Sequence, residues 1–560
     1  MSSYIVNRRT VLGGSAALGA AGLLAACGKK NTEAKQTLSE NTDLKDIFNI
    51  NEQPVSALKS GGEFNLALTA MGTDFNQWSV SGGVTDTRTA LSPVYAAGAW
   101  ISKYDGTPVL NTNFVEACEE TEENGKQVIT YTLNPKAKFN DGTDFDVEAF
   151  KTTWQIKRSA KSDYKILTPE MYPQIESVEA VDGDAKKVKV TFSTPYYPLS
   201  EIFSLIMHPK MIDVELFNNG FVNNPHSELG AGPFKVEKWD TSAKVLSLVP
   251  NENWWGDKPV LSKINFRQME AQAARAAFKN GELDAISANT AANYTELNGT
   301  AGTETRKGQY LFAGGLMLNP AKITDQAVRK AIFLGTDRAA LSKIRFQNMP
   351  YEEKLSGSMI LMPFSKNYRD NFPQPEGDAK SAVAKVLEAA GYTKGEKYYA
   401  KDGKDLKISF TIFGDSAVNT ATAQTFAQNM QSMGIDCEVV TEATQNFSKV
   451  MAGKEYHVAL SGYGVSSDPT VATKQFYLST DNDGVGNAEI DKLIEQMQLE
   501  KDDAKRAALC NDIEKKHMDE VSVMGTLFNG PNFVVCKKDL ANYGAFLFET
   551  IDWTKVGWKA

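Results

Sequence analysis

Alternating and helical hydrophobic patterns divide the first half of the chain into strands and helices. Residues 61–68 and 127–133 alternate apolar with polar side chains, which predicts strands with one buried face. An Asp182-Gly183 pair between two further alternating runs predicts a β-hairpin. Asp146 can cap a helix whose apolar side chains recur at 147, 150 and 154. Together these signals indicate a mixed α+β region.

The second half alternates strands with helices more regularly. Helices are predicted from Asp378 to Gly391 and over 420–433, and strands at 407–413, 435–440 and 456–462. This alternation favours an α/β sheet with parallel pairing. Ligands of such sheets bind beyond the carboxyl ends of the strands. The loop 463–469, which follows the third strand, is therefore a candidate binding site.

The N-terminus is typical of an export signal. Arg8 and Arg9 precede an apolar run from Val11, and no acidic residue occurs before Cys27. The run ends in Leu24-Ala25-Ala26-Cys27, which resembles a bacterial lipobox. This resemblance implies that residues 1–26 are a signal peptide and that Cys27 is lipidated. The protein would then be anchored on the outer face of the cytoplasmic membrane, after export by the general or the twin-arginine route.

Composition adds a predicted tether and excludes one class of partner. Residues 27–60 are polar and poor in aromatics, which predicts a flexible, lipid-anchored linker. The formal charge is −9, and loss of Arg8 and Arg9 with the leader makes it −11. This acidic balance, without a basic stripe, argues against nucleic acid as a partner. The remaining cysteines allow three disulfide pairings, which stay open: Cys118, Cys437, Cys510 and Cys536.

Motifs of enzymes are absent from the sequence after residue 26. It has four histidines and no His-Glu-x-x-His, no Gly-x-Ser-x-Gly, no Cys-x-x-Cys and no phosphate-binding loop. We therefore expect no catalytic activity, no cofactor and no metal site. Any ATPase that acts with this protein must be another subunit.

Several ordered segments resemble the family 5 extracellular solute-binding proteins, the dipeptide and oligopeptide receptors of ABC importers. They include Tyr131-x-Leu133-x-Pro135-x-Ala137-x-Phe139-x-Asp141-Gly142-Thr143, Gly230-Ala231-Gly232-Pro233-Phe234, Asn251-Glu252-Asn253-Trp254-Trp255, Gly281-Glu282-Leu283-Asp284 and Val328-Arg329-Lys330-Ala331. Each match is modest alone, but together they extend over most of the chain. We expect most of these residues to be structural. Trp254 and Trp255 in particular are expected in the core rather than on the cleft.

The resemblance implies a two-lobed α/β fold, similar to the type II periplasmic binding proteins, with an additional α+β domain and a hinge. Lobe I would comprise residues 60–103, 230–300 and 525–560, the extra domain 104–229, and the second lobe 301–524. The hinge would lie near residues 300 and 525. Closure of the lobes around a peptide would deliver it to the permease and ATPase subunits of the importer, and a monomer is expected.

The resemblance also implies candidate ligand contacts. In related receptors, the loop after the third strand carries an aromatic residue and an aspartate that pairs with the peptide's α-amino group. Tyr463 fits the aromatic position, whereas Ser466 occupies the place of the aspartate; Ser467 and Asp468 follow. This departure predicts weak recognition of a free α-amine. On lobe I, a second candidate would pair with the backbone of an extended peptide: Ser79, Val80, Ser81, Gly82 and Gly83.

Two alternatives keep the fold and change the function. Relatives of this family also bind oligosaccharides, nickel complexes or other small solutes, and a loop with Ser466 and Ser467 would suit a sugar. Nickel is less favoured because the chain has so few histidines. A receptor that signals without import is the other alternative.

Overall fold

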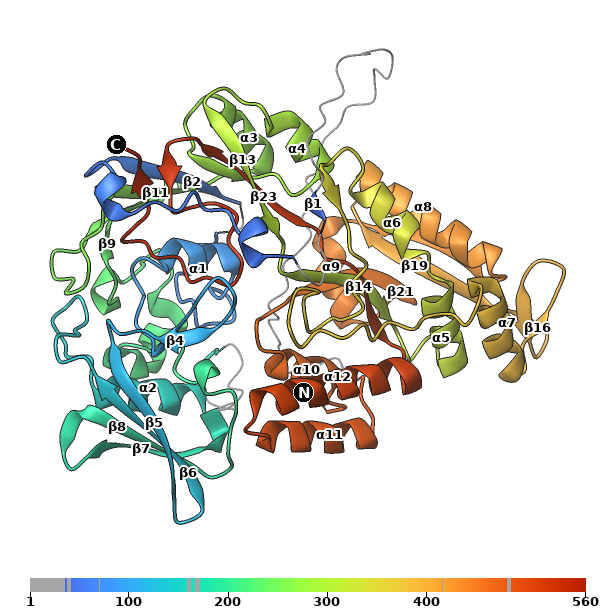
Figure 1. The fold of residues 1–560 in the computed structure, drawn as a ribbon, viewed down its shortest axis with the longest axis horizontal. Coiled ribbons are helices and arrows are strands. Elements are labelled where there is room, and N and C mark those ends of the chain that lie inside the picture. The colour runs from blue at the N-terminus through green and yellow to red at the C-terminus, as the bar shows by residue number, and fades with distance from the viewer. Residues whose placement is uncertain are drawn as a thin grey trace.

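The computed structural model describes most of the chain after the predicted leader. The described residues are 36–37, 42–69, 71–158, 163–166, 172–414, 416–480 and 485–560. The predicted signal peptide and Cys27 lie outside them. Three large sheets dominate the described part (Figure 1).

The first sheet has seven strands in the order β13-β23-β12-β2-β11-β10-β9. The central strand β2 alternates as predicted, since Phe64, Leu66 and Leu68 are buried and pack in one core. It runs parallel to β11, with Phe64 opposite Ile264. The strands are β2 Glu63–Leu68, β9 Phe234–Asp240, β10 Val245–Pro250, β11 Lys263–Gln268, β12 Ala285–Ser287, β13 Thr303–Gln309 and β23 Pro531–Lys537; the helices are α1 Thr85–Leu91, α3 Ala271–Lys279 and α4 Ala291–Leu297.

The extra domain is built on a four-stranded antiparallel sheet, in the order β5-β6-β8-β7. The predicted hairpin joins β7 to β8 through Asp182 and Gly183, both with positive φ, as a tight Asp-Gly turn requires. The side chain of Asp146 caps α2, as predicted. The elements are β5 Val115–Glu123, β6 Lys126–Leu133, α2 Val147–Lys157, β7 Ile175–Val181 and β8 Asp184–Phe192; a separate hairpin pairs β3 Trp100–Ser102 with β4 Pro108–Leu110.

The third sheet has five strands in the order β20-β19-β21-β14-β22 and belongs to the second lobe. Its predicted strands pair in parallel, but β14 and β22 add antiparallel pairs, so the sheet is mixed. The strands are β14 Phe312–Leu318, β19 Lys407–Phe413, β20 Asp436–Glu442, β21 Val458–Gly464 and β22 Met524–Phe528. The helices are α5 Gln326–Gly335, α6 Arg338–Arg345, α7 Ala379–Ala389, α8 Ala417–Ser432, α9 Phe447–Ala452, α10 Thr470–Tyr477, α11 Ala488–Leu499 and α12 Asp503–Glu520.

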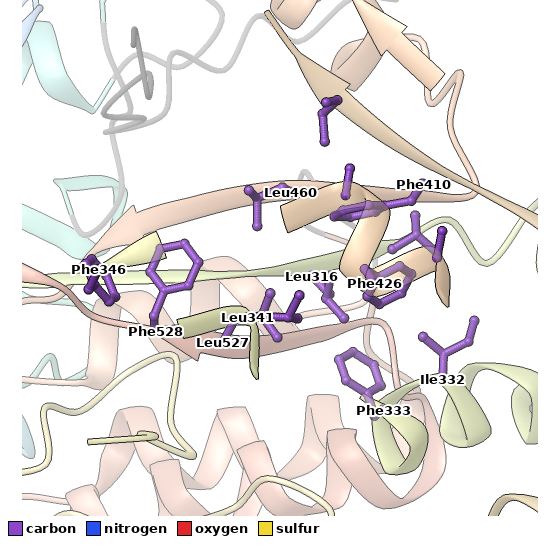
Figure 2. Close-up of a cluster of buried hydrophobic side chains, with 14 of the residues drawn as sticks. Leu316, Ile332, Phe333, Leu341, Phe346, Phe410, Phe426, Leu460, Leu527 and Phe528 are labelled. Carbon is purple, nitrogen blue, oxygen red and sulfur yellow. The ribbon is translucent and has the colours of Figure 1, made fainter. Parts of the chain in front are cut away.

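Aromatic and aliphatic side chains join this sheet to its helices (Figure 2). Phe410 of β19 packs on Phe426 of α8 with ring centroids 4.5 Å apart, and both are fully buried. Leu316 of β14 and Phe333 of α5 belong to the same cluster. Burial of one such side chain contributes about 1.5–3 kcal/mol. The apolar faces of the helices therefore hold them on the sheet.

The chain crosses between the lobes twice, later than the sequence predicts. Strand β13 joins the first sheet and β22 the second, so the crossings lie at 310–311 and 529–530 rather than near 300 and 525. The two passes are bonded to each other, because the N–H of Tyr310 donates to the carbonyl of Gly530. The Glu353 carboxylate accepts the N–H groups of Asn529 and Gly530 at 3.1 and 2.8 Å. The strands that flank these crossings, β13, β14, β22 and β23, were not predicted from the sequence.

The described part of the predicted linker contacts the folded body. Ile47 is 1% exposed, and its carbonyl accepts the N–H of Gln309. Asn49 forms a β-bridge with Ala545. Residues 42–60 therefore pack along lobe I, although the sequence predicts that they are flexible. The buried contacts come from two isoleucines, Ile47 and Ile50. The polar composition of the stretch as a whole did not indicate them.

Candidate functional site

A cavity of about 1280 Å³ lies between the second lobe and the other two units. Ser92 of the segment after α1 and Trp553 line it from lobe I, and Asn113 from the extra domain. Met362 and Ser467 line it from the second lobe. All three units therefore contribute to its wall, as expected for a site that closes by lobe movement.

The loop after β21 reaches the cavity, as the rule of carboxyl strand ends predicts. Ser466, Ser467 and Asp468 line the wall. The Ser466 hydroxyl donates to the carbonyl of Asp468 at 2.7 Å. The N–H of Thr470 donates to the Asp468 carboxylate at 2.8 Å, and Arg506 Nη2 lies 3.3 Å from its other oxygen. The loop is thus fixed by its own hydrogen bonds, and the Asp468 charge already has a cationic partner.

An aromatic wall covers the side of the cavity formed by the extra domain. Trp254 and Trp255 line the cavity with ring centroids 4.5 Å apart, and Phe114 packs edge-on against Trp255 at 5.2 Å. The Trp255 indole N–H donates to the carbonyl of Asn113 at 2.7 Å. The Trp254 indole N–H donates to the carbonyl of Asp257 at 3.0 Å. Since both N–H groups are satisfied, the rings offer mainly apolar surface to a ligand.

Carboxylates outnumber cations on the described wall. Two cationic residues line it, Arg88 and Lys366. Six acidic residues line it: Asp105, Glu201, Asp257, Asp468, Asp503 and Asp552. The formal difference, two minus six, is −4. Asp468 and Asp503 are paired with Arg506, and Asp552 is paired with Lys555, so the other three carboxylates exceed the two cations by one. The wall therefore gives no electrostatic advantage to an anionic ligand.

Comparison with known proteins decides the family. The sequence model described as "Bacterial extracellular solute-binding proteins, family 5 Middle" matches residues 91–484. The chain belongs to this family. Family 5 proteins are non-enzymatic receptors that bind solutes for ABC importers, so the expected absence of enzymatic activity agrees with the family.

Individual relatives show how the ligand varies on one fold. The oligopeptide-binding protein OppA of Mycobacterium tuberculosis is 26% identical over 548 residues, which cover 96% of this chain and 91% of OppA. The periplasmic EDTA-binding protein EppA superposes with a TM-score of 0.81 at 21% identity, over 92% of this chain and 99% of EppA. AppA from Bacillus subtilis, in complex with a nonapeptide, gives a TM-score of 0.69 at 18% identity, over 90% of this chain and 100% of AppA. These likenesses confirm the predicted fold.

Tyr463, the predicted aromatic contact of this family 5 protein, lies behind the cavity wall. Its side chain is 2% exposed, and its ring packs on Phe476 with centroids 4.4 Å apart. It is not among the described residues that line the cavity. Because helices and loops cover both faces of β21, residues at alternate positions are all buried there. Strand position alone could not separate a core tyrosine from a ligand contact.

The segment 79–83 also lies off the described cavity wall. Ser79 is 1% exposed, its hydroxyl donates to Asp74 at 3.0 Å, and the N–H of Val80 donates to the carbonyl of Lys165. A Cβ on Gly82 would lie 2.4 Å from the carbonyl oxygen of Asn76. The glycine therefore permits close packing of a turn on its own domain. The structure does not bring this segment together with the loop after β21.

Trp254 and Trp255 are the functional candidates that the sequence prediction missed. They were expected in the core, and they do pack against the core of the extra domain, but they also line the cavity. Two adjacent large aromatics after a strand and before a glycine, Gly256, were the available signal. Both side chains are half-buried, which is typical of a binding wall.

One contact across the cavity mouth depends on a glycine. Gly106 lies in the β3–β4 hairpin, with φ +83°, at the start of the extra domain. A Cβ placed there would lie 2.3 Å from Ser467 Cβ and 3.1 Å from the Phe548 ring. Ser467 belongs to the second lobe. The absence of a side chain at Gly106 therefore lets the two sides approach.

No described group of histidine, cysteine and acidic side chains could hold a metal ion. None of the four histidines is on the described wall. His517 is buried, Nε2 accepts the N–H groups of Val523 and Met524, and burial lowers its pKa to about 3. The four cysteines described are free thiols. Within the residues that the structure describes, no helix is long and apolar enough to cross a membrane.

Proposed function

We propose that this family 5 protein is a lipid-anchored receptor that delivers oligopeptides to an ABC importer. The observation that carries the proposal is the cavity between the lobes, about 1280 Å³. Sites for drug-sized ligands measure roughly 300–1,000 Å³. The size suits a peptide of several residues better than a chelate or a single small solute. OppA, which covers nearly the whole chain, is described as oligopeptide-binding, and AppA was crystallised with a nonapeptide.

The charges of the wall support a peptide over a metal chelate. Fe(III)-EDTA is an anion, and a site for it needs an excess of cations. The wall here has two cationic residues and six carboxylates, three of which are paired with Arg506 or Lys555. A peptide backbone is neutral and hydrogen-bonds with polar groups such as Ser466 and Ser467. Apolar peptide side chains would pack on the aromatic wall.

We propose that the ligand's α-amine contributes little. The place of the family's aspartate is held by Ser466, and the nearby Asp468 already binds Arg506 and caps α10. An ammonium group would have to compete with this internal pair. Backbone contacts then supply most of the affinity, and the lobes close around the peptide by rotation at the crossings 310–311 and 529–530.

Thermal unfolding with three candidate ligands tests the proposal. A ligand that binds only the folded protein stabilises it by about 2.7 kcal/mol at a hundredfold excess over its Kd. We expect a randomised nonapeptide pool to raise the melting temperature, and Fe(III)-EDTA to leave it unchanged. An oligosaccharide mixture is the second candidate, because the paired rings of Trp254 and Trp255 could stack on a sugar. A rise with sugars and none with peptides would replace the proposed ligand class.

The anchoring proposal rests on the sequence alone. Arg8, Arg9 and the apolar run resemble an export signal, and Leu24-Ala25-Ala26-Cys27 resembles a lipobox. We propose that Cys27 carries the lipid and that the mature protein begins there. Residues 28–35 would then link the membrane to the body, since Gln36 and Thr37 already pair with Tyr351 and Glu352 of the second lobe.

A further inference from the structure

An ion pair joins the extra domain to the second lobe beside the cavity. Lys501 Nζ lies 2.8 Å from a carboxylate oxygen of Glu120. Glu120 is on β5, and Lys501 is in the short segment between α11 and α12. Figure 1 shows the sheet of β5 to β8 and the helices α10 to α12 on opposite sides of the lower part of the molecule. Asp503, two residues after Lys501, lines the cavity. So does Pro198, which follows Tyr197, a contact of Glu120.

The extra domain holds the Glu120 carboxylate in place before Lys501 reaches it. The Tyr197 hydroxyl donates to Glu120 at 2.7 Å, and the Gln127 amide donates at 3.1 Å. The Glu120 side chain is 19% exposed, whereas Lys501 is 67% exposed. Burial raises the pKa of Glu120, but the hydrogen bonds of Lys501, Tyr197 and Gln127 outweigh it and lower the pKa overall. The carboxylate is therefore charged and oriented, and the more exposed lysine completes the pair.

A second contact links the same place to the loop that lines the cavity. The Arg506 guanidinium lies 6.0 Å from the centre of the Tyr197 ring, at the limit of a cation–π contact. Arg506 Nε donates to the Thr470 hydroxyl at 3.1 Å, and Nη2 to Asp468 at 3.3 Å. Its side chain is 1% exposed. Arg506 thus contacts the extra domain on one side and positions the cavity loop on the other.

We propose that Glu120, Lys501, Tyr197 and Arg506 form a latch that closes across the cleft and stabilises the closed lobes without touching the ligand. The latch rests on the proposed function, because it requires lobes that open and close. In an open state Lys501 would be solvated and Arg506 would keep only its contacts within the second lobe. A contact made in one state alone shifts the population toward that state. Partly exposed ion pairs change such an equilibrium by no more than about fivefold.

Zero-length carbodiimide coupling tests the latch on the intact chain. The reagent joins a carboxylate to an amine as an amide, with loss of water, only where the two groups touch. Mass spectrometry then measures the Glu120–Lys501 product. The pair Glu176 and Lys126, 2.5 Å apart within the extra domain, is an internal standard that lobe movement does not alter. We expect the ratio of the first product to the second to rise about threefold or more when a randomised nonapeptide pool is added.

Matched variants define the outcomes. Lys501→Met should remove the first product, whereas Lys505→Met, an exposed lysine on α12, should leave the ratio unchanged. Absence of the Glu120–Lys501 product in the wild type overturns the latch. So does an unchanged ratio when the pool raises the melting temperature of the same sample, because the contact would then be a fixed strut.

A ligand-free arm separates the latch from the proposed function. If the pool does not raise the melting temperature, the proposal of peptide binding is refuted. The latch is then tested by comparing the ratio of the two products in ligand-free wild type and Gly106→Ala. This variant places a Cβ against Ser467 and disfavours the closed lobes. A lower ratio of products in ligand-free Gly106→Ala than in ligand-free wild type supports the latch. An equal ratio overturns it.

Discussion

Replacement of Gly106 by alanine should weaken ligand binding by opposing closure of the lobes. The new Cβ would lie 2.3 Å from Ser467 Cβ and 3.1 Å from the Phe548 ring. Non-bonded carbons prefer separations of about 3.5–4.0 Å. The hairpin and the loop must therefore move apart by about 1 Å or more. In the proposed open form these two atoms separate, so the clash destabilises the closed form alone.

The size of the effect follows from two separate costs. Overpacking of this kind costs about 1–3 kcal/mol. If the cost falls on the closed form alone, affinity drops about 5- to 150-fold. The φ of +83° at Gly106 adds a strain of about 1–2 kcal/mol for alanine, but this strain is present in the open and closed forms alike. It lowers the melting temperature of the ligand-free protein and leaves the affinity unchanged.

A second substitution separates these costs. Ser467→Gly in the Gly106→Ala background removes the clashing Cβ and leaves the φ strain. Titration calorimetry with one nonapeptide, selected from a randomised pool by wild-type binding, should show that the double variant binds nearly as tightly as Ser467→Gly alone, which is the control for loss of the proposed Ser467 hydrogen bond. The melting temperature of the ligand-free protein should stay low. Equal affinity of Gly106→Ala and wild type, or no recovery in the double variant, would refute closure at this contact.

Four further predictions address the wall, the ligand, the core and the anchor. Trp255→Ala should weaken nonapeptide binding about tenfold or more, roughly 1.4 kcal/mol. Trp558 lies off the described wall, so Trp558→Ala should leave binding unchanged. Equal effects of the two substitutions in calorimetry would contradict a role for the aromatic wall. N-acetylation of a bound peptide should cost less than about tenfold in calorimetry, and a thousandfold loss would show that an acid reads the α-amine. His517 is neutral in the fold, with a pKa of about 3, and has a pKa near 6.5 when unfolded. Unfolding therefore takes up a proton below about pH 6.5, and stability falls there by up to about 1.4 kcal/mol per pH unit. His517→Gln should lose this dependence in urea titrations, and an unchanged acid slope would show that the pKa of His517 in the fold is close to its unfolded value. Cys27→Ala should release the protein from membranes or leave an uncut precursor; unchanged size and membrane retention would exclude lipidation.

The elements that local signals predicted are largely confirmed, although many others were not predicted. The strand at 407–413 has the predicted bounds, and the caps at Asp146 and Asp378 are formed as expected. The Asp182-Gly183 turn likewise lies where the sequence places it. Each depends on residues close together in the chain, whose hydrogen bonds and backbone preferences are independent of the rest of the fold.

Features that depend on distant partners could not be predicted. The pairing of β13 with β23 and of β14 with β22 sets the crossings, and nothing in either strand specifies its neighbour. The position of the Ser466 loop on the cavity follows from its place after a strand. The sequence pattern does not distinguish whether Tyr463, at the end of that strand, contacts ligand or packs in the core. The contact of Glu120 with Lys501 joins two distant polar segments, and each alone resembles an ordinary solvated surface.

Native mass spectrometry of the protein, purified without unfolding from its own cells, tests the central proposal most directly. Ligand held between closed lobes should be retained and should appear as added mass. We predict a series of adducts that fragment as peptides of several residues and disappear after unfolding and refolding. Adducts that fragment as sugars or metal chelates, with no peptide among them, would contradict the proposal.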